Sequence, residues 1–577
     1  MMEPILAWLE RRDWDEGATL MVFGTVIGVA SGLGVVGFYR LIDLAHFVLI
    51  QLPESHLPTV GQAFYRPLLT GLGVWAAWLV VRRAKIADGQ NVPDVQLAVA
   101  KRDGLIATGP VIVRTIASAL TLGSGASAGS EGPVAVLGAG LGSSLGRRLH
   151  FQPRHLKILV GCGAAAGIAG AFNAPFAGAF FALEEILGSF SVGAFSPVVI
   201  ASVVGALTVR PFLGNHPFFA SRMPASARPL EIFLYPILGV ACGLLSAGYA
   251  RAYLSALALG KRMPGPPWVW PLLAGGVTGL IAIASRGLLA GNGHLAIPEP
   301  IFGGLAWYAL IAISIAKIVS TVITLGFGGS GGVFTPTLFI GAALGGGLGV
   351  LGAEVLPAGL IHPHAWAFVG MAGMVAGATR APLTAIFMVF EMTDDYTYVV
   401  PLMIVAVIAY TTARRYSPHG LYDGWLAARG EHLAHGVDQS VMDHTHVADA
   451  LDREVEVVPA NASISGLVAA AAATRHGVLP VVDPDGALVG IVSHHVLREA
   501  ILSRSDLDAV VVAADLAEAV DALSPRDSLR HALAVMNARG LDALPVVDTT
   551  GHGARFAGLL GRSDVLRVYE RALSHAI

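Results

Sequence analysis

Long apolar stretches recur along this chain of 577 residues and are separated by short polar or basic segments. A helix needs about 20 mostly apolar residues to cross the hydrocarbon core of a bilayer. The stretches that approach this length are 20–50, 67–81, 158–183, 232–259, 268–283, 307–325 and 399–412. Several of them are shorter or more interrupted than a simple span. The pattern predicts an all-α polytopic membrane protein in which some helices are broken or re-entrant.

Composition supports a membrane-embedded chain, because 54% of the residues are hydrophobic and only 13% are charged. Glycine contributes 70 residues, which cluster in the apolar regions and allow close helix packing and interrupted helices. The net charge of −3 and the lack of a nucleic-acid motif argue against a nucleic-acid partner. The two cysteines, Cys162 and Cys242, lie far apart in apolar segments and predict neither a disulfide framework nor a metal site.

The carboxylate of Glu131 lies in an apolar, glycine-rich segment, where a charged residue is unusual. Glu131 belongs to the segment 129–133, which reads Gly-Ser-Glu-Gly-Pro, and Arg114 is the only other charged residue between positions 106 and 146. An ionisable group at membrane depth costs several kcal/mol unless it lines a polar path. Glu131 is therefore a candidate functional residue.

The apolar part of the chain contains an internal repeat. Pro133 and the glycines around it match Pro336 and its neighbours at an offset of 336 − 133 = 203, and Glu184 matches Glu391 at 391 − 184 = 207. Two such halves are typical of transporters whose site lies where broken helices of both halves meet. We expect one transmembrane domain, 17–430, with repeat halves at about 17–220 and 221–430. The matches alone fit parallel or inverted halves, and the inverted arrangement is our expectation. Phe334 stands opposite Glu131, so the repeat itself does not require a carboxylate there.

A second repeat occupies the more polar C-terminal part. Residues 477–492 and 541–560 each contain a short apolar strand, a turn and a second strand, and helical periodicity precedes both. We expect these two units, 438–507 and 508–577, to pack together into one small α/β module behind a linker at 431–437. The polar segment 1–16 lacks the apolar core of a signal peptide and is expected to be a cytoplasmic N-terminal segment.

Four motifs in order resemble the CLC family of chloride channels and chloride/proton antiporters, and the C-terminal part resembles a pair of CBS domains. Segment 129–133 is similar to the family's GxEGP motif and segment 332–336 to its GxFxP motif. The runs 171–175 with 184–185, and 391–396, are also similar to family signatures. The resemblance implies a membrane domain of broken helices with an α/β CBS pair in the cytoplasm.

The resemblance also implies an anion site. Glu131, flanked by Ser130 and Gly132, would be the gating glutamate that competes with the anion. The backbone N–H groups of Val333 and Phe334 would hold the anion at a helix N-terminus. A hydroxyl donor is expected from Tyr422, for which an ordinary tyrosine at the membrane interface is the alternative. In the remaining anion-binding segment, Gln90 and Asn91 replace the usual serine and glycine, which leaves anion preference open.

A second carboxylate, that of Glu185, bears on whether the protein is an exchanger or a passive channel. Glu185 matches the internal proton-transfer glutamate of the family's antiporters, whereas Glu184 fits an architectural position because it has a repeat mate. We therefore expect chloride/proton exchange. A passive gated chloride channel, a fluoride/proton exchanger and a CBS-regulated divalent-cation transporter stay open as alternatives. No nucleophile with a base at plausible spacing and no phosphate loop points to an enzyme.

CBS pairs often bind adenine nucleotides, and here each half-site is incomplete. Asp564 keeps the usual acid beside Gly561, and Ser493 keeps the usual hydroxyl without the acid. Nucleotide binding and a purely structural role are equally open, and no other cofactor is expected. The resemblance further implies a homodimer, a multi-pass location in the inner (plasma) membrane, and chloride and protons as the transported ions.

Overall fold

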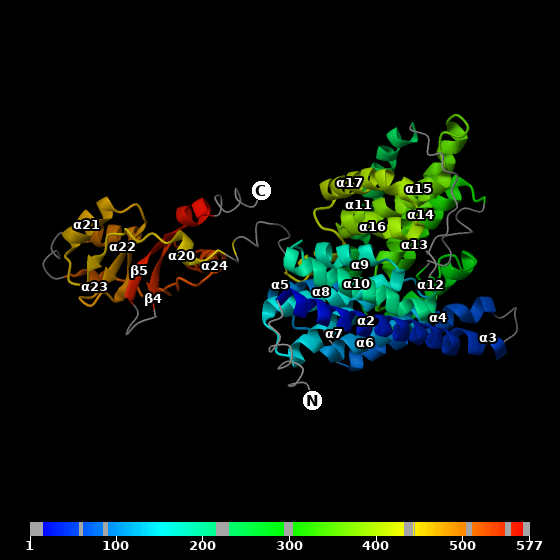
Figure 1. Ribbon diagram of the computed structural model, residues 1–577, viewed down its shortest axis with the longest axis horizontal. Helices are drawn as coiled ribbons and strands as arrows, with labels where there is room; N and C mark the ends of the chain where they lie inside the picture. Colours follow the sequence, from blue (N-terminus) through cyan, green and yellow to red (C-terminus); the bar gives the residue numbers. More distant parts are fainter. Residues whose placement is uncertain are drawn as a thin grey trace. The chain divides into compact units, whose positions relative to one another are not determined.

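The computed structural model describes residues 16–56, 62–84, 91–214, 230–292, 304–431, 442, 445–503, 511–548 and 555–568. The chain divides into two compact units, Met1–Leu433 and Ala434–Ile577 (Figure 1). Each unit has its own buried apolar core.

The extended regular elements of unit 1 are all helices among its described residues. Its longer helices are α2 (Glu16–His46), α4 (Gln62–Arg83), α5 (Val92–Lys101), α6 (Thr108–Gly123), α7 (Glu131–Arg148), α8 (Pro153–Phe172), α9 (Pro175–Phe181), α10 (Val192–Leu213), α11 (Tyr235–Arg262), α12 (Val269–Ala284), α13 (Trp307–Gly326), α14 (Phe334–Val355), α15 (Pro363–Thr379), α16 (Pro382–Thr393), α17 (Val399–Tyr416) and α18 (Leu421–Ala427). Short elements are η1 (Phe47–Gln51), α3 (Leu52–His56), η3 (Ala182–Ile186), η4 (Glu231–Phe233) and η6 (Tyr396–Tyr398).

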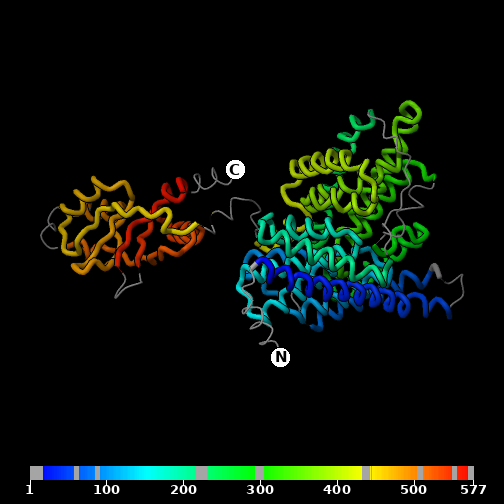
Figure 2. Tube along the Cα trace, viewed as in Figure 1, coloured from blue at the N-terminus to red at the C-terminus, as the bar shows by residue number. Residues whose placement is uncertain are grey.

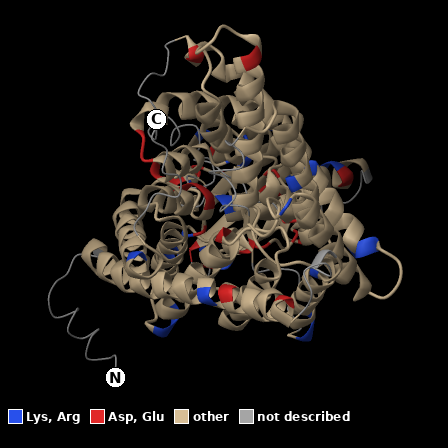
Figure 3. Cartoon of the chain, turned by 90° about the vertical axis from the view of Figure 1, so that its right-hand side faces the viewer, with Lys and Arg blue, Asp and Glu red and all other residues tan. Residues whose placement is uncertain are grey.

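Eight helical segments among the described residues are long and apolar enough to cross a membrane. Charged residues are sparse along the helices of this unit (Figure 3). The tube in Figure 2 shows the long α2, which packs against α8 and α10.

The hydrophobic pattern located six of the eight long apolar segments and misjudged three regions. The stretch 158–183 is not continuous, because α8 ends before Asn173, which has a left-handed φ of 51°, and Pro175 begins α9. The pattern also missed α10 and α14 as spans. α10 contains Pro197 in its first two turns and Pro211 in its last turn, and α14 is rich in glycine at its middle. Both helices are nevertheless long and apolar enough to span a membrane.

Glycine sets the distance between the central helices. A Cβ on Gly138 of α7 would lie 2.0 Å from the carbonyl oxygen of Gly163 on α8, which is too close for any side chain. The repeat mates Gly341 of α14 and Gly370 of α15 make the same contact, with 2.4 Å from the added Cβ to the oxygen. The two helix pairs therefore pack backbone against backbone, as small residues permit in membranes.

Equivalent residues of the two halves meet each other directly. Gly129 and Gly332 form an antiparallel bridge in which each N–H donates to the other's carbonyl at 2.7 Å. The rings of Phe180 and Phe387 stack with 4.2 Å between centroids and 2° between planes. Both pairs are repeat mates, so a local two-fold rotation relates the halves.

The halves also exchange helix caps. Glu391 at the end of α16 accepts the first free N–H groups of α9, from Phe176 (3.0 Å) and Ala177 (2.8 Å). Glu184 accepts the corresponding groups of α16, from Leu383 (3.1 Å) and Thr384 (2.7 Å). A carboxylate satisfies orphan N–H groups and complements the positive end of the helix dipole. Glu184 thus occupies the architectural position that its repeat mate predicted.

Unit 2 contains two similar α/β halves. The first has β1 (Val458–Pro459), α21 (Ile464–Ala473), β2 (Val478–Val482), β3 (Leu488–Ser493) and α22 (His494–Ser503), in a sheet of order β1-β2-β3. The second has α24 (Leu529–Arg539), β4 (Ala543–Asp548) and β5 (Arg555–Gly561) in an antiparallel pair, and α20 (Val447–Ala450) and α23 (Ala513–Leu516) complete the unit. Val478, Ile491, Ala543 and Leu559 from both halves form one buried cluster, as expected for two units that pack together.

Replacing Glu391 by Leu should destabilise unit 1, because the N–H groups of Phe176 and Ala177 lose their acceptor. We expect the free energy of unfolding to fall by about 1–3 kcal/mol. The thermal unfolding midpoint of the purified protein in detergent measures the change. Glu391→Gln keeps one carbonyl acceptor and should lose less, and an unchanged midpoint for Glu391→Leu would contradict the capping role.

Candidate functional site

Glu131 reaches from one half of unit 1 to the other. It is the first residue of α7, and its side chain is buried with 2% of the residue exposed. Its Oε1 accepts the backbone N–H of Thr335 at 2.9 Å, and its Oε2 accepts the Thr335 hydroxyl at 2.5 Å. Thr335 lies in the first turn of α14, where N–H groups have no partner within the helix. The carboxylate therefore occupies an anion position at a helix N-terminus.

A small cavity lies beside this contact, where four helices begin. Its lining comes from the start of α5 (Asn91, Val92, Pro93), of α7 (Gly132), of α14 (Val333) and of α18 (Leu421, Tyr422), together with Tyr253, Gly331, Gly332 and Trp425. The cavity measures about 20 Å³, and roughly 10–15 Å³ of such space holds one water. Each helix start adds free N–H groups and the positive end of a dipole. The cavity suits a small anion.

A larger cavity of about 590 Å³ adjoins the small one and shares Asn91, Tyr253, Gly331 and Trp425 with it. Four basic residues contribute to its lining: Arg114, Lys261, Arg262 and Arg429. Cationic walls raise the local concentration of anions. Together the two cavities form a wide basic vestibule that leads to a narrow end at the helix starts.

Glu185 lies on a different element from the cavity. It belongs to the π-helical turn η3, and 6% of the residue is exposed. Its Oε1 accepts the side-chain amide of Gln96 on α5 at 2.8 Å. Single π turns inside helices occur often at functional sites. The adjacent Glu184 instead accepts the N–H of Thr384 at the start of α16. The two neighbouring glutamates therefore have different partners.

The structure brings most of the residues singled out from the sequence to one region. Asn91, Gly132, Val333 and Tyr422 line the small cavity. Glu131, Ser130 and Phe334 are buried at the helix starts that surround it, and the Phe334 ring packs against Phe172 and Phe181. Glu185 stands apart, bound to Gln96. Gln90 lies outside the described residues.

Three residues of this region were not anticipated from the sequence. Thr335 supplies both partners of the Glu131 carboxylate, although its hydroxyl in the first turn of a helix was a visible signal. Gln96 binds Glu185. The hydroxyl of Tyr39 on α2 lies 3.3 Å from Ser130 Oγ. The partners of Gln96 and Tyr39 are about 90 residues away along the chain, so no local pattern could reveal them.

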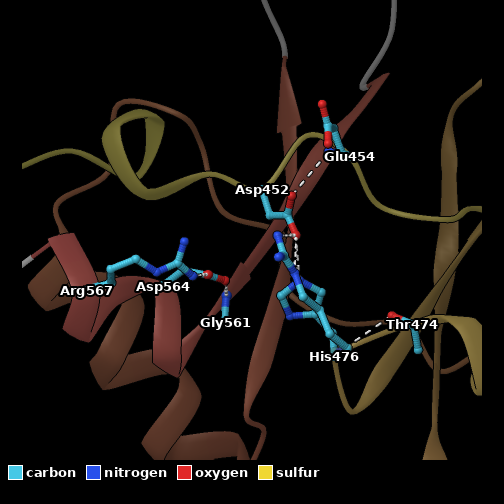
Figure 4. Close-up of polar contacts among 8 residues, drawn as sticks. Asp452, Glu454, Thr474, His476, Gly561, Asp564 and Arg567 are labelled. Atoms are coloured by element: carbon cyan, nitrogen blue, oxygen red, sulfur yellow. Dashed lines mark hydrogen bonds and ion pairs between the residues drawn. The ribbon is translucent and has the colours of Figure 1, made fainter.

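The candidate nucleotide residues of unit 2 have internal partners. Ser493 Oγ accepts the N–H of Val496 at 3.3 Å and so caps α22. Asp564 is buried, and its two oxygens bind the N–H of Gly561 (3.1 Å) and the guanidinium of Arg567 (Figure 4). A Cβ on Gly561 would lie 3.0 Å from His476 Nδ1, which explains glycine where the resemblance leads one to expect Ser or Thr. In this arrangement these residues do not offer a nucleotide a free set of partners.

Asp452 holds the neighbouring histidine in place. Its Oδ2 accepts His476 Nε2 at 2.9 Å and Arg475 Nη2 at 2.6 Å, and its Oδ1 accepts the N–H of Glu454 at 3.2 Å (Figure 4). Burial tends to raise the pKa of Asp452, but the hydrogen bonds from His476 and Arg475 outweigh it and lower the pKa below its usual value. The Asp452 backbone pairs with Leu559 of β5, so the cluster joins the two halves of unit 2.

Unit 1 is a multi-pass membrane structure whose two related halves meet at a small cavity, the architecture of an ion transporter with structural repeats. The family described as voltage gated chloride channel matches residues 72–414, and the CBS domain matches residues 447–503 and 512–571. The chain therefore belongs to the voltage-gated chloride channel (CLC) family and carries a CBS pair. The predicted fold class, a helical membrane domain followed by an α/β CBS pair, is confirmed.

Individual relatives agree with this assignment. A protein named as ClcB-like from Ralstonia nicotianae is 32% identical over 415 residues, which are 71% of this chain and 96% of the relative. The H⁺/Cl⁻ exchange transporter ClcA of Yersinia pseudotuberculosis is 29% identical over 419 residues, or 71% and 87% of the two chains.

Solved structures share the fold. A slow cyanobacterial Cl⁻/H⁺ antiporter superposes with a TM-score of 0.65 at 24% identity and covers 71% of this chain and 97% of its own. A eukaryotic CLC transporter gives a TM-score of 0.62 at 20% identity and covers 94% and 97%.

Replacing Gly129 by Ala should expel the Glu131 carboxylate from its position at α14. The added Cβ would lie 1.9 Å from Glu131 Oε1, so the contact with Thr335 cannot persist. We expect a loss of stability of about 1–3 kcal/mol and an experimental structure in which Glu131 has turned away. Gly109→Ala on α6, where the added Cβ meets no atom within 4 Å, is the matched control. An unmoved Glu131 in Gly129→Ala would refute the steric argument.

Replacing Asp452 by Asn should weaken unit 2 at pH 7 by about 1 kcal/mol, allowing for the solvent exposure of Arg475. Because folding lowers the pKa of Asp452, its contribution is full above an unfolded pKa of about 3.9 and is lost as pH falls through the folded value. Hydrogen exchange of the β5 amides in the full-length protein, at pH 7 and near pH 3, measures both effects. The wild type should lose protection with acid more steeply than the variant, and parallel pH profiles would contradict this account.

Proposed function

We propose that this protein exchanges chloride for protons across the membrane, with Glu131 as the gate. The observation that carries the proposal is the Glu131 carboxylate, which occupies the donor groups of Thr335 at the start of α14 as a tethered anion. A free halide needs the same donors. The name of the ClcA relative, an H⁺/Cl⁻ exchange transporter, supports the same reading.

The gate works through charge. An ionised Glu131 holds the N–H and hydroxyl of Thr335 by charge-assisted hydrogen bonds. A proton removes that charge, the contact weakens, and the side chain can leave the donors to an arriving anion. Proton binding and anion entry are thereby linked at one position. Release of the anion is rapid because N–H dipoles, rather than a buried cationic side chain, hold it in the small cavity.

Glu185 favours exchange over passive conduction. It is buried away from the cavity lining and gives protons a second titratable group on a route that diverges from the basic vestibule. A channel would need the Glu131 gate but not this second carboxylate. The four helix starts and the basic vestibule favour an anion over a divalent cation, which requires oxygen ligands.

The wider setting follows from the same proposal. The protein would be a homodimer in the inner (plasma) membrane, with unit 2 in the cytoplasm as a regulatory or structural module. Ser493 and Asp564 serve internal caps, so a structural role of unit 2 is preferred to nucleotide binding.

Purified protein in liposomes tests the exchange. With a chloride gradient and no initial pH difference, protons should move uphill against the direction of chloride, and a proton ionophore should collapse the resulting pH gradient. Chloride flux with no proton movement would rule out exchange and support the channel hypothesis. Competition with fluoride in the same vesicles separates a chloride exchanger from a fluoride exchanger.

Glu131→Gln should abolish proton movement while chloride flux continues, because a neutral amide cannot carry a proton through the cycle. The matched control is Glu354→Gln, which changes an exposed glutamate at the other end of α14 and should leave the proton-to-chloride ratio unchanged. Wild-type coupling in Glu131→Gln would remove Glu131 from the mechanism.

A further inference from the structure

Helix α5 contacts both of the proposed ion sites. Asn91, Val92 and Pro93 at its start line the small cavity. Gln96, four residues after Val92 and so about 6 Å further along the helix axis, binds Glu185. One short helix therefore joins the anion cavity to the proposed proton carboxylate.

The Gln96 amide has a fixed orientation. Its Nε2 donates to the Glu185 carboxylate (2.8 Å) and to the Glu185 backbone carbonyl (2.9 Å). Both partners are acceptors, so the NH₂ group must face them. Gln96 is 2% exposed, and its Oε1 has no hydrogen-bond partner among the described residues. A buried amide oxygen without a partner is costly in a stable core, which points to a second state in which it is used.

The other groups that face Glu185 do not favour its charged form. Glu184 lies on the same element, and Asp423 and Tyr422 of α18 are near enough to interact electrostatically with Glu185. The two carboxylates repel the charge of Glu185, whereas Gln96 donates to it. Gln96 is thus the neighbour that supports ionised Glu185.

The start of α5 is tied to the cavity wall. Asp94 Oδ2 accepts the N–H of Asn91 at 2.9 Å, and Asp94 Oδ1 pairs with Arg429 at 3.2 Å. The Arg429 guanidinium lies 3.6 Å from the ring centroid of Trp425, which lines both cavities. A displacement of α5 at Gln96 would therefore also displace Asn91 and, through Asp94 and Arg429, Trp425.

We propose that Gln96 is a positioning residue that couples the protonation of Glu185 to the anion cavity. This inference rests on the proposed exchange function. Nε2 holds Glu185 while it is ionised. When Glu185 takes up a proton, the amide turns over, and the free Oε1 accepts the new carboxylic O–H. An amide can serve both forms because it carries a donor and an acceptor.

Gln96→Met keeps the length of the side chain and removes the amide. In liposomes we expect chloride flux to continue, the number of protons moved per chloride to fall several-fold, and the internal-pH midpoint of proton flux to rise by about one unit, as expected when a charge-assisted hydrogen bond is lost. Gln96→Glu keeps the shape and can donate to Glu185 only when protonated, so its proton flux should recover as internal pH falls.

Ser143→Ala is the matched control. It removes two other buried hydrogen bonds, from the Ile106 N–H (2.9 Å) and to the Gly104 carbonyl (2.7 Å), and should change neither the ratio nor the midpoint. If Gln96 were merely structural, Gln96→Met would behave like this control. A wild-type proton-to-chloride ratio and internal-pH midpoint in Gln96→Met would overturn the proposal. A proton flux that does not depend on internal pH in Gln96→Glu would overturn it as well. If wild-type protein moves no protons, the exchange function fails first, and the role of Gln96 fails with it.

Discussion

The backbone bridge between Gly129 and Gly332 is the contact on which the rest of unit 1 depends. Two N–H···O bonds of 2.7 Å join the halves at equivalent residues, and α7 and α14 both begin within two residues of it. A Cβ at either glycine would meet the Glu131 carboxylate in its present position. The bridge fixes where the two helices start, and therefore where their free N–H groups point.

The chemistry of the region arises where the two-fold relation between the halves is broken. At equivalent positions one half places the carboxylate of Glu131 and the other the ring of Phe334. The Phe334 ring packs against Phe172 and Phe181, so the start of α14 is anchored by apolar contacts. One half thus supplies the carboxylate and the other the hydrogen-bond donors that it contacts. A fully symmetric pair would have placed two carboxylates, or none, at the same point.

The sequence foretold the features that recur along the chain. Offsets of 203 and 207 paired residues that touch in space, such as Phe180 with Phe387, and hydrophobicity located six of the eight long apolar segments. Contacts that depend on a single distant partner could not be foretold. Gln96 looks like an ordinary polar residue of an amphipathic helix until α5 is packed against η3, and Gly561 gains its meaning only when His476 is seen beside it. The break at Asn173 was hidden because both flanking helices are apolar.

The exchanged caps have a consequence for how the chain is made. The backbone N–H group of Phe176 donates to Glu391, which lies 215 residues later in the sequence. At about 5–20 residues per second the ribosome needs roughly 10–40 s to reach it. During synthesis α9 must remain with unsatisfied N–H groups, sheltered by the insertion machinery or by water at the membrane surface. The first half therefore cannot complete this cap until the second half has been made.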